Sequence, residues 1–257
     1  MISTSYSLNK SYNNYSSTVS KISSGTDDSN VANMAISTSM NADSSALQAA
    51  ASNVTQANDL LNTASGGLQN ISDLEQNMAS LATQASSGAL SDQDRSALNQ
   101  QFQSDAAQVN QIAAKAQFNG VNTLDGSLSG SGAATFQVGT KASDIASVSI
   151  GNAAISQKLD ISTQAGASQA EGAVQSALTS NIANEAGVGA EQSVLNSTAS
   201  NISQSISSTE AASAQLSETD VASSSTQSAI DSVQMQASIT MIKKTNQMYS
   251  ETQKLLD

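Results

Sequence analysis

The stretch from Leu60 to Gly88, LLNTASGGLQNISDLEQNMASLATQASSG, carries the clearest structural pattern in the chain. Its apolar residues are Leu60, Ala64, Leu68, Ile71, Leu74, Met78, Leu81 and Ala85. The seven steps between them cover about 25 residues, or roughly 3.6 residues per step, which is the α-helical repeat. The remaining positions are mostly polar. Because a helix with so narrow an apolar stripe has no core of its own, the pattern predicts that it packs against partner helices.

Composition points to long helices rather than to a thick globular core. The 257 residues are 38% hydrophobic and 3% aromatic, and they include neither tryptophan nor proline. Proline is the strongest helix breaker, so its absence favours uninterrupted helices. The net charge of −12 argues against binding nucleic acid, which requires a basic surface. No apolar run is long enough for a transmembrane helix, so we expect no membrane insertion.

The N-terminal residues form a heptad pattern. Leu8, Tyr12, Tyr15, Val19 and Ile22 are separated by 4, 3, 4 and 3 residues. Gly25 is a natural end for this helix. Asp27 and Asp28 follow, and they could cap the next helix or contribute to a metal site. We favour the cap, because no further acidic residue lies nearby, and we predict no metal site.

A long helix is expected from Asn30 to about Ser87. Gly66 and Gly67 interrupt it, and we expect close packing of another backbone at this point. Ser91 and Asp94 have the spacing of a capping signal for the next helix. Asn119-Gly120 then predicts a tight turn.

The middle of the chain, about 121–170, has a different texture. Glycine is frequent, and short alternating runs occur at 135–138 and 146–150. Such runs are typical of β-hairpins. We expect this insert to be a surface loop or a small subdomain.

Helical patterns return from Val174. Leu195, Ala199, Ile202, Ile206, Thr209, Ser213 and Leu216 alternate in steps of 4 and 3 residues. We expect Leu68, Ile71, Leu74 and Met78 to pack against this seam. A break is predicted at 217–220, before a last helix whose apolar residues are Ile230, Val233, Ala237, Met241, Met248 and Leu255. The pair Lys243-Lys244 could contact an anionic partner, but a solvated helix face is the favoured interpretation.

These patterns predict a mainly α fold. We expect an elongated antiparallel helical bundle or coiled coil with a small β-hairpin region in the middle of the chain. The terminal helices, 1–27 and 217–257, would form one discontinuous domain, and 28–216 would form a rod-like bundle with the insert at about 121–170.

Several short motifs resemble those of bacterial flagellins, in the same order along nearly the whole chain. Ser20–Gly25 resembles the family's R-L-S-S-G, and 116–121 (AQFNGV) resembles T-Q-F-N-G-V. Phe136–Gly139 is similar to I-Q-V-G, 188–192 to L-G-A-x-Q, and 218–222 to E-D-A-D-x-A. The chain departs from the family in its shorter N-terminus, in its single arginine, Arg95, and in having no room for large outer variable domains.

The resemblance implies a structural subunit of the bacterial flagellar filament, the propeller for swimming motility. Such a subunit would leave the cell unfolded through the flagellar type III export channel and polymerise through its terminal helices. Its partners would be other copies of itself, an export chaperone, the filament cap and the hook-junction proteins. Its location would be extracellular, in the filament.

We predict that one set of residues carries packing and self-assembly. These residues are Leu8, Tyr12, Tyr15, Val19, Ile22, Leu68, Ile71, Leu74, Met78, Leu195, Ile202, Ile206, Leu216, Ile230, Val233, Ala237 and Leu255.

Three other functions are alternatives to a filament subunit. A hook–filament junction protein shares the terminal pattern. A secreted coiled-coil surface or translocator protein would also have long helices but would not polymerise. An enzyme is the third, but with neither histidine nor cysteine the chain lacks a zinc-protease motif and a histidine-activated nucleophile, so we predict no catalytic activity and no cofactor.

Overall fold

The computed structural model describes residues 2–25, 31–155, 157–217 and 221–255. Its long helices are α1 (Ile2–Ser24), α2 (Val31–Ala85), α3 (Asp92–Lys115), α4 (Gln164–Ser217) and α5 (Val221–Lys254). Between α3 and α4 lie the strands β1 (Gln117–Phe118), β2 (Val121–Asn122), β3 (Ala134–Gln137) and β4 (Ile145–Val148), with the short 3-10 helix η1 (Gly130–Gly132) before β3. The mainly α fold with two small hairpins is confirmed. Asp27, Asp28 and most of the predicted break at 217–220 lie outside the described residues.

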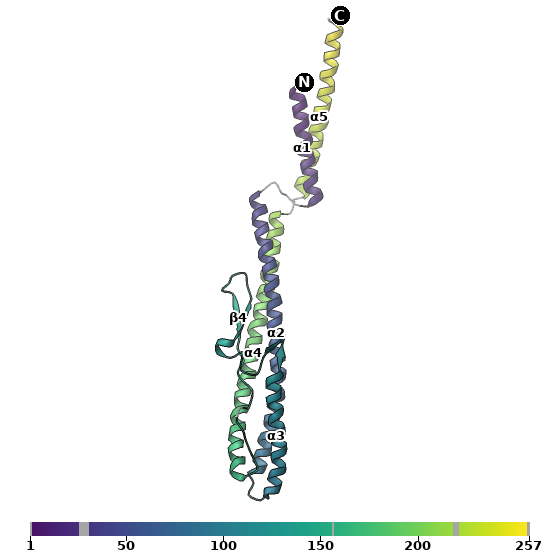
Figure 1. Ribbon diagram of the computed structural model, residues 1–257. Helices are drawn as coiled ribbons and strands as arrows, with labels where there is room; N and C mark the ends of the chain where they lie inside the picture. Colours follow the sequence, from purple (N-terminus) through teal and green to yellow (C-terminus); the bar gives the residue numbers. More distant parts are fainter. Residues whose placement is uncertain (1, 26–30, 156, 218–220, 256–257) are drawn as a thin grey trace. The chain divides into compact units, whose positions relative to one another are not determined.

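The chain divides into two compact units. The bundle unit comprises Ser44–Ile206, and the terminal unit comprises Met1–Asp43 together with Ser207–Asp257. Figure 1 shows α2, α3 and α4 side by side in the bundle unit, and α1 beside α5 in the terminal unit. Both α2 and α4 contribute residues to each unit. The predicted division into one domain of 1–27 with 217–257 and another of 28–216 stays a prediction.

Polar side chains join α2 to α4 in antiparallel order within the bundle unit. Asn181 donates to Ser72 Oγ, and Thr83 donates to Glu171. Further along, Gln192 donates to Asn62. The second half of α2 therefore lies against the first half of α4.

This register overturns one expectation. Leu68 lies beside Asn181, which donates to its carbonyl oxygen, so Leu68 to Met78 do not face the seam that begins at Leu195. Leu195 instead lies near the point where Asn196 accepts a hydrogen bond from Asn58. The stretch of α4 that pairs with the strongest stripe of α2 is weakly apolar, so the sequence pattern did not mark it as the partner.

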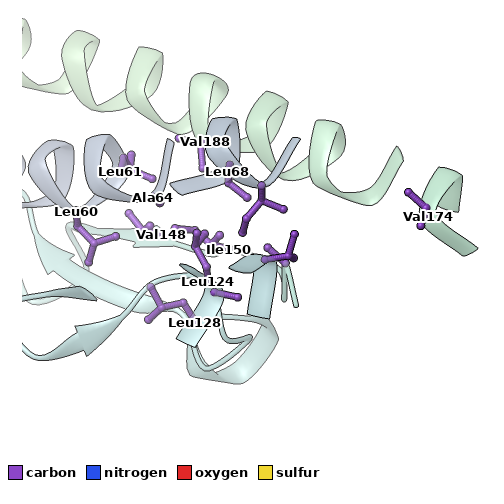
Figure 2. Packing of buried hydrophobic residues seen from close by; sticks show 14 of the residues in the cluster. Leu60, Leu61, Ala64, Leu68, Leu124, Leu128, Val148, Ile150, Val174 and Val188 are labelled. Atoms are coloured by element: carbon purple, nitrogen blue, oxygen red, sulfur yellow. The ribbon is translucent and has the colours of Figure 1, made fainter. Parts of the chain in front are cut away.

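The middle segment contributes to the core and is not a surface loop. Leu124, Val148 and Ile150 are fully buried. Figure 2 shows Leu60, Leu61, Ala64 and Leu68 of α2 between Val188 of α4 on one side and Leu124, Leu128, Val148 and Ile150 on the other. The alternation of apolar and polar residues in these short strands turns one face toward α2.

After β4 the segment returns along α3. Ile155 and Ile161 donate their backbone N–H groups to the side chains of Asn110 and Asn99, respectively. Helix α4 begins at Gln164, so the insert ends at Thr163, before the expected boundary near 170. The predicted turn is confirmed: Asn119 and Gly120 have φ of 49° and 80° and connect β1 to β2.

The connection between α2 and α3 is built around Arg95, the only arginine of the chain. The predicted capping box is present, with Ser91 and Asp94 bonded reciprocally. The buried guanidinium of Arg95 donates to the carbonyl oxygens of Ala85, Ser87 and Leu90 at 2.9, 2.8 and 3.0 Å. Ala85 ends α2, and carbonyls at a helix C-terminus lack intrahelical partners, so Arg95 supplies a donor to this carbonyl and joins it to two carbonyls of the following loop.

We expect Arg95→Met to destabilise the bundle unit by about 2 kcal/mol or more, because it removes three charge-assisted hydrogen bonds to backbone carbonyls. Urea unfolding of the soluble subunit measures the loss. Lys115→Met, which removes an exposed cation from the last turn of α3, is the control and should change stability little. Equal stabilities for the two variants would contradict this role of Arg95.

The two adjacent glycines of α2 differ in their surroundings. A Cβ on Gly67 would lie 2.5 Å from Cδ1 of the buried Leu124 and 3.5 Å from Cβ of Ala116. A Cβ on Gly66 would meet nothing within 4 Å. Close packing thus explains Gly67 only, and its neighbours are side chains rather than the backbone that we expected.

This difference gives a matched pair of substitutions. Gly66→Ala should stabilise the subunit by up to about 1 kcal/mol, the helix-propensity difference. Gly67→Ala should destabilise it by about 1–2 kcal/mol, because the clash with Leu124 outweighs that gain. Both values come from urea unfolding monitored by circular dichroism. A Gly67→Ala subunit as stable as Gly66→Ala would refute the close packing.

Candidate self-assembly surface

The terminal unit pairs α1 with α5 in antiparallel order. Thr18, near the end of α1, donates a hydrogen bond to Asp231, near the start of α5. Leu8 and Tyr12, earlier in α1, line a groove with Met235 and Ile239, later in α5. The groove has a volume of about 380 Å³.

The seam of α5 that α1 covers is mostly polar. Its less exposed residues recur at heptad spacing and are Ser224, Ser228, Asp231, Met235, Ser238, Ile242 and Thr245. Asp231 is buried and also accepts a bond from Gln227 at 2.9 Å. Since five of these seven side chains carry hydroxyl or carboxyl groups, the pairing of α1 with α5 buries little apolar surface.

The predicted apolar stripe of α5 lies on another face and is exposed. Ile230, Val233, Met241, Met248 and Leu255 are between 45 and 85% exposed, and Ala237 is exposed as well. We call these six residues the α5 stripe. They follow one another at 3, 4, 4, 7 and 7 residues, so they form a single line along the helix. Lys244 and Glu251 lie on the same line, between Met241 and Met248 and between Met248 and Leu255, so the apolar surface is densest from Ile230 to Met241. Exposed apolar residues grouped in this way are typical of protein–protein contact sites.

The predicted heptad seam of α1 divides into two groups. Leu8, Tyr15 and Ile22 are half-buried, whereas Tyr12 and Val19 are exposed. Ser11 and Thr18 complete the side of α1 that is turned to α5. Sequence reasoning missed this polar seam, since it searched for apolar residues; the heptad spacing of serines and threonines in α5 was the available signal.

The other predicted packing residues lie in the interior. Leu68, Ile71, Met78, Leu195 and Ile202 are buried in the bundle unit, and Leu74 and Ile206 are partly buried beside them. Leu216 is partly buried within the terminal unit. The predicted set therefore contains buried core residues and exposed residues available to other molecules.

Among the described residues, no three acidic side chains cluster closely enough to hold a metal ion. Nor does any described helix have the length and apolarity that crossing a membrane would need. Lys243 and Lys244 are exposed, as expected for a solvated face.

Replacing the buried carboxylate of the seam tests how the terminal helices are held. We expect Asp231→Leu to strengthen the pairing of α1 with α5, because burying a carboxyl group costs free energy that burying a leucine side chain does not. Backbone hydrogen exchange in α1 should slow by about tenfold, equivalent to about 1.4 kcal/mol.

The control is Glu251→Leu, a change of the same type at an exposed position near the end of α5. Faster exchange in Asp231→Leu would show that the bond from Thr18 contributes more than the apolar replacement.

Comparisons with known proteins agree on one family. The sequence profile of the bacterial flagellin N-terminal helical region matches residues 1–129. A flagellin of Listeria monocytogenes is 29% identical over 245 residues, which cover 88% of this chain and 84% of that protein.

Two solved structures share the fold. The crystal structure of Bacillus cereus flagellin matches with a TM-score of 0.54 at 22% identity, over 59% of this chain and 88% of that one. A putative flagellar hook-associated protein from Vibrio parahaemolyticus matches with a TM-score of 0.61 at 14% identity, over 72% of this chain and 97% of that one.

Proposed function

The chain belongs to the bacterial flagellin family, and from that premise we propose that the α5 stripe, with Tyr12 and Val19 of α1, joins each subunit to its neighbours. Flagellins are structural proteins that polymerise with copies of themselves into the extracellular flagellar filament. This chain is accordingly a structural subunit of that filament. The proposal concerns which of its surfaces make the contacts.

The observation that carries the proposal is the position of the apolar residues in the terminal unit. A coiled-coil pair normally places its apolar residues in the shared seam. Here the seam between α1 and α5 is mostly polar, while Val233 is 65% exposed and Met241 63% exposed. Covering this stripe with another copy would remove apolar surface from water, at about 25 cal/mol per Å².

The contact between copies would be heterologous. The α5 stripe of one subunit would meet a different surface of the next, such as the groove lined by Leu8, Tyr12, Met235 and Ile239. A head-to-tail contact that does not close into a ring generates a helical filament. Burial repeated in every copy then supplies stability that the weak α1–α5 pair lacks alone.

By family membership, residues 1–27 and 217–257 would line the inner part of the filament wall, and 28–216 would form its outer part. The same membership suggests export as an unfolded chain through the type III channel. The expected accessory partners are an export chaperone, the filament cap and the hook-junction proteins.

A filament subunit is favoured over the hook–filament junction and translocator alternatives by the relatives in sequence. The Listeria flagellin aligns over most of both chains, whereas the hook-associated protein is 14% identical and shares the fold alone.

Substitution within the α5 stripe tests the proposed contact. Val233→Asp should raise the subunit concentration needed for growth on filament seeds by tenfold or more, because burying an unpaired carboxylate costs more than about 1.4 kcal/mol. Growth is measured by light scattering. Circular dichroism should find the soluble subunit as helical as the wild type, since Val233 is exposed there.

Ser225→Asp is the control, because it adds the same charge at an exposed position of α5 outside the stripe. It should support growth close to the wild-type rate. Growth of Val233→Asp at the rate of Ser225→Asp would exclude the stripe as the contact surface.

A further inference from the structure

Methionine supplies all of the sulfur in this chain. The sequence contains seven methionines and no cysteine, and it also lacks tryptophan. Peroxides convert the thioether of methionine to a sulfoxide, and thiols, where they are present, react with the same oxidants. Because no thiol competes in this subunit, the reaction falls on the methionines, and their accessibility decides which of them react.

The methionines differ widely in their exposure to water. Met241 and Met248 of α5 are 63 and 56% exposed, and Met34 of α2 is 44% exposed. Met78, in the core of the bundle unit, is 0% exposed. The half-buried methionines are Met40 and Met235. Since a peroxide must reach the sulfur atom, the exposed methionines react first, and the fold protects Met78.

Position distinguishes Met241 and Met248 from the exposed Met34. Both belong to the α5 stripe, and because they are seven residues apart they lie on the same side of the helix, about two turns from each other. Met241 ends the densest apolar part of the stripe, which begins at Ile230. Met34 lies on α2, outside the stripe. In the described part of the chain, the most exposed thioethers therefore belong to the surface proposed for contact between subunits.

Oxidation turns this apolar side chain into a polar one. The O–O bond of hydrogen peroxide breaks, one oxygen atom is transferred to Sδ, and the other leaves as water. The thioether loses two electrons, which the peroxide gains. The oxygen of the resulting sulfoxide accepts hydrogen bonds from water in the soluble subunit. Covering that oxygen with an apolar surface that offers no donor costs free energy.

We propose that Met241 and Met248 form an oxidation site that controls assembly, in which hydrogen peroxide converts both thioethers to sulfoxides and the α5 stripe then fails to bind the next subunit. This role, which rests on the function proposed above for the α5 stripe, adds a chemical signal to which the contact responds. The sulfoxides leave the fold of the subunit unchanged, because both side chains extend into water there. They act on association alone.

Assembly and oxidation oppose each other. A neighbour that covers the α5 stripe also keeps the peroxide from both sulfur atoms, so an assembled subunit is protected and a soluble one is not. The oxidised state is reversible, because methionine sulfoxide reductases restore the thioether. In that step two thiols become a disulfide, and the sulfoxide oxygen leaves as water. A reduced subunit therefore regains its contact surface.

Treatment of the soluble subunit with hydrogen peroxide tests the accessibility of the site. Peptide mass spectrometry over a time course should find sulfoxide at Met241 and Met248 well before it appears at Met78. In assembled filaments, Met241 and Met248 should be oxidised more slowly than in the soluble subunit. Circular dichroism should find the oxidised subunit as helical as the untreated one.

Growth on filament seeds, measured by light scattering, tests the effect on assembly. Peroxide treatment of the wild-type subunit should raise the subunit concentration needed for growth by about tenfold or more, equivalent to about 1.4 kcal/mol. Subsequent treatment with methionine sulfoxide reductases and a dithiol should return this concentration to the untreated value. Recovery of this kind attributes the loss to sulfoxides and to no other damage.

Two variants locate the effect, and each is compared with its own untreated sample. The double variant Met241→Leu with Met248→Leu keeps apolar side chains of similar size but has no sulfur at these positions, so peroxide should change its growth little. Met34→Leu is the matched control, because it removes an exposed thioether outside the stripe. Peroxide should reduce the growth of Met34→Leu as much as that of the wild type.

Three results would overturn the oxidation site: Met78 oxidised as fast as Met241, unchanged growth of the oxidised wild-type subunit, or equal losses in the wild type and the double variant. Val233→Asp tests the α5 contact without any oxidation. If the oxidised wild type grows normally and Val233→Asp does not, the stripe is the contact surface and only the oxidation site is excluded. Equal oxidation of Met241 in filaments and in the soluble subunit would exclude both.

Discussion

The antiparallel register between α2 and α4 decides which side chains enter the core of the bundle unit. It is held by polar contacts at intervals along the two helices, from Thr83 with Glu171 to Asn58 with Asn196. Alanine and serine, common on both helices, pack almost equally well after a shift of one turn. Specific hydrogen bonds discriminate between such shifts, because a displaced Asn181 would leave its buried amide unpaired.

The rest of the bundle unit depends on this register. Leu68 lies near Asn181 of α4, and the neighbouring Gly67 is turned toward the middle segment. Leu124 of that segment packs directly against Gly67. Leu128, Val148 and Ile150 then cover the same side of α2, while Phe102 and Val109 of α3 extend the buried cluster. The chain has only three phenylalanines, yet its core is continuous. Small residues lie at the points where larger side chains pack against a helix.

The terminal unit distributes its residues in the opposite way. Most side chains in the seam between α1 and α5 carry hydroxyl or carboxyl groups, and most of the large apolar residues of α5 remain in water. Such an arrangement is of little use to an isolated chain, but it suits a subunit whose stability increases when neighbours cover it. A polar intramolecular seam also leaves the terminal helices easy to separate, which suits the export as an unfolded chain proposed above.

The sequence by itself determined the helices, their order and the family. The 3.6-residue repeat between Leu60 and Ala85, the Ser91 capping box and the Asn119-Gly120 turn depend on local backbone geometry, and local geometry is encoded in neighbouring residues. The stripe of α5 was visible for the same reason. Tertiary structure alone decided which side of each helix is covered: it placed Val233 in water and Asp231 in the seam, and it brought Asn181 to Ser72 across 109 positions of sequence. Periodicity shows that residues share a helix face, but it cannot show what that face meets, because this depends on the register of helices far apart in the chain.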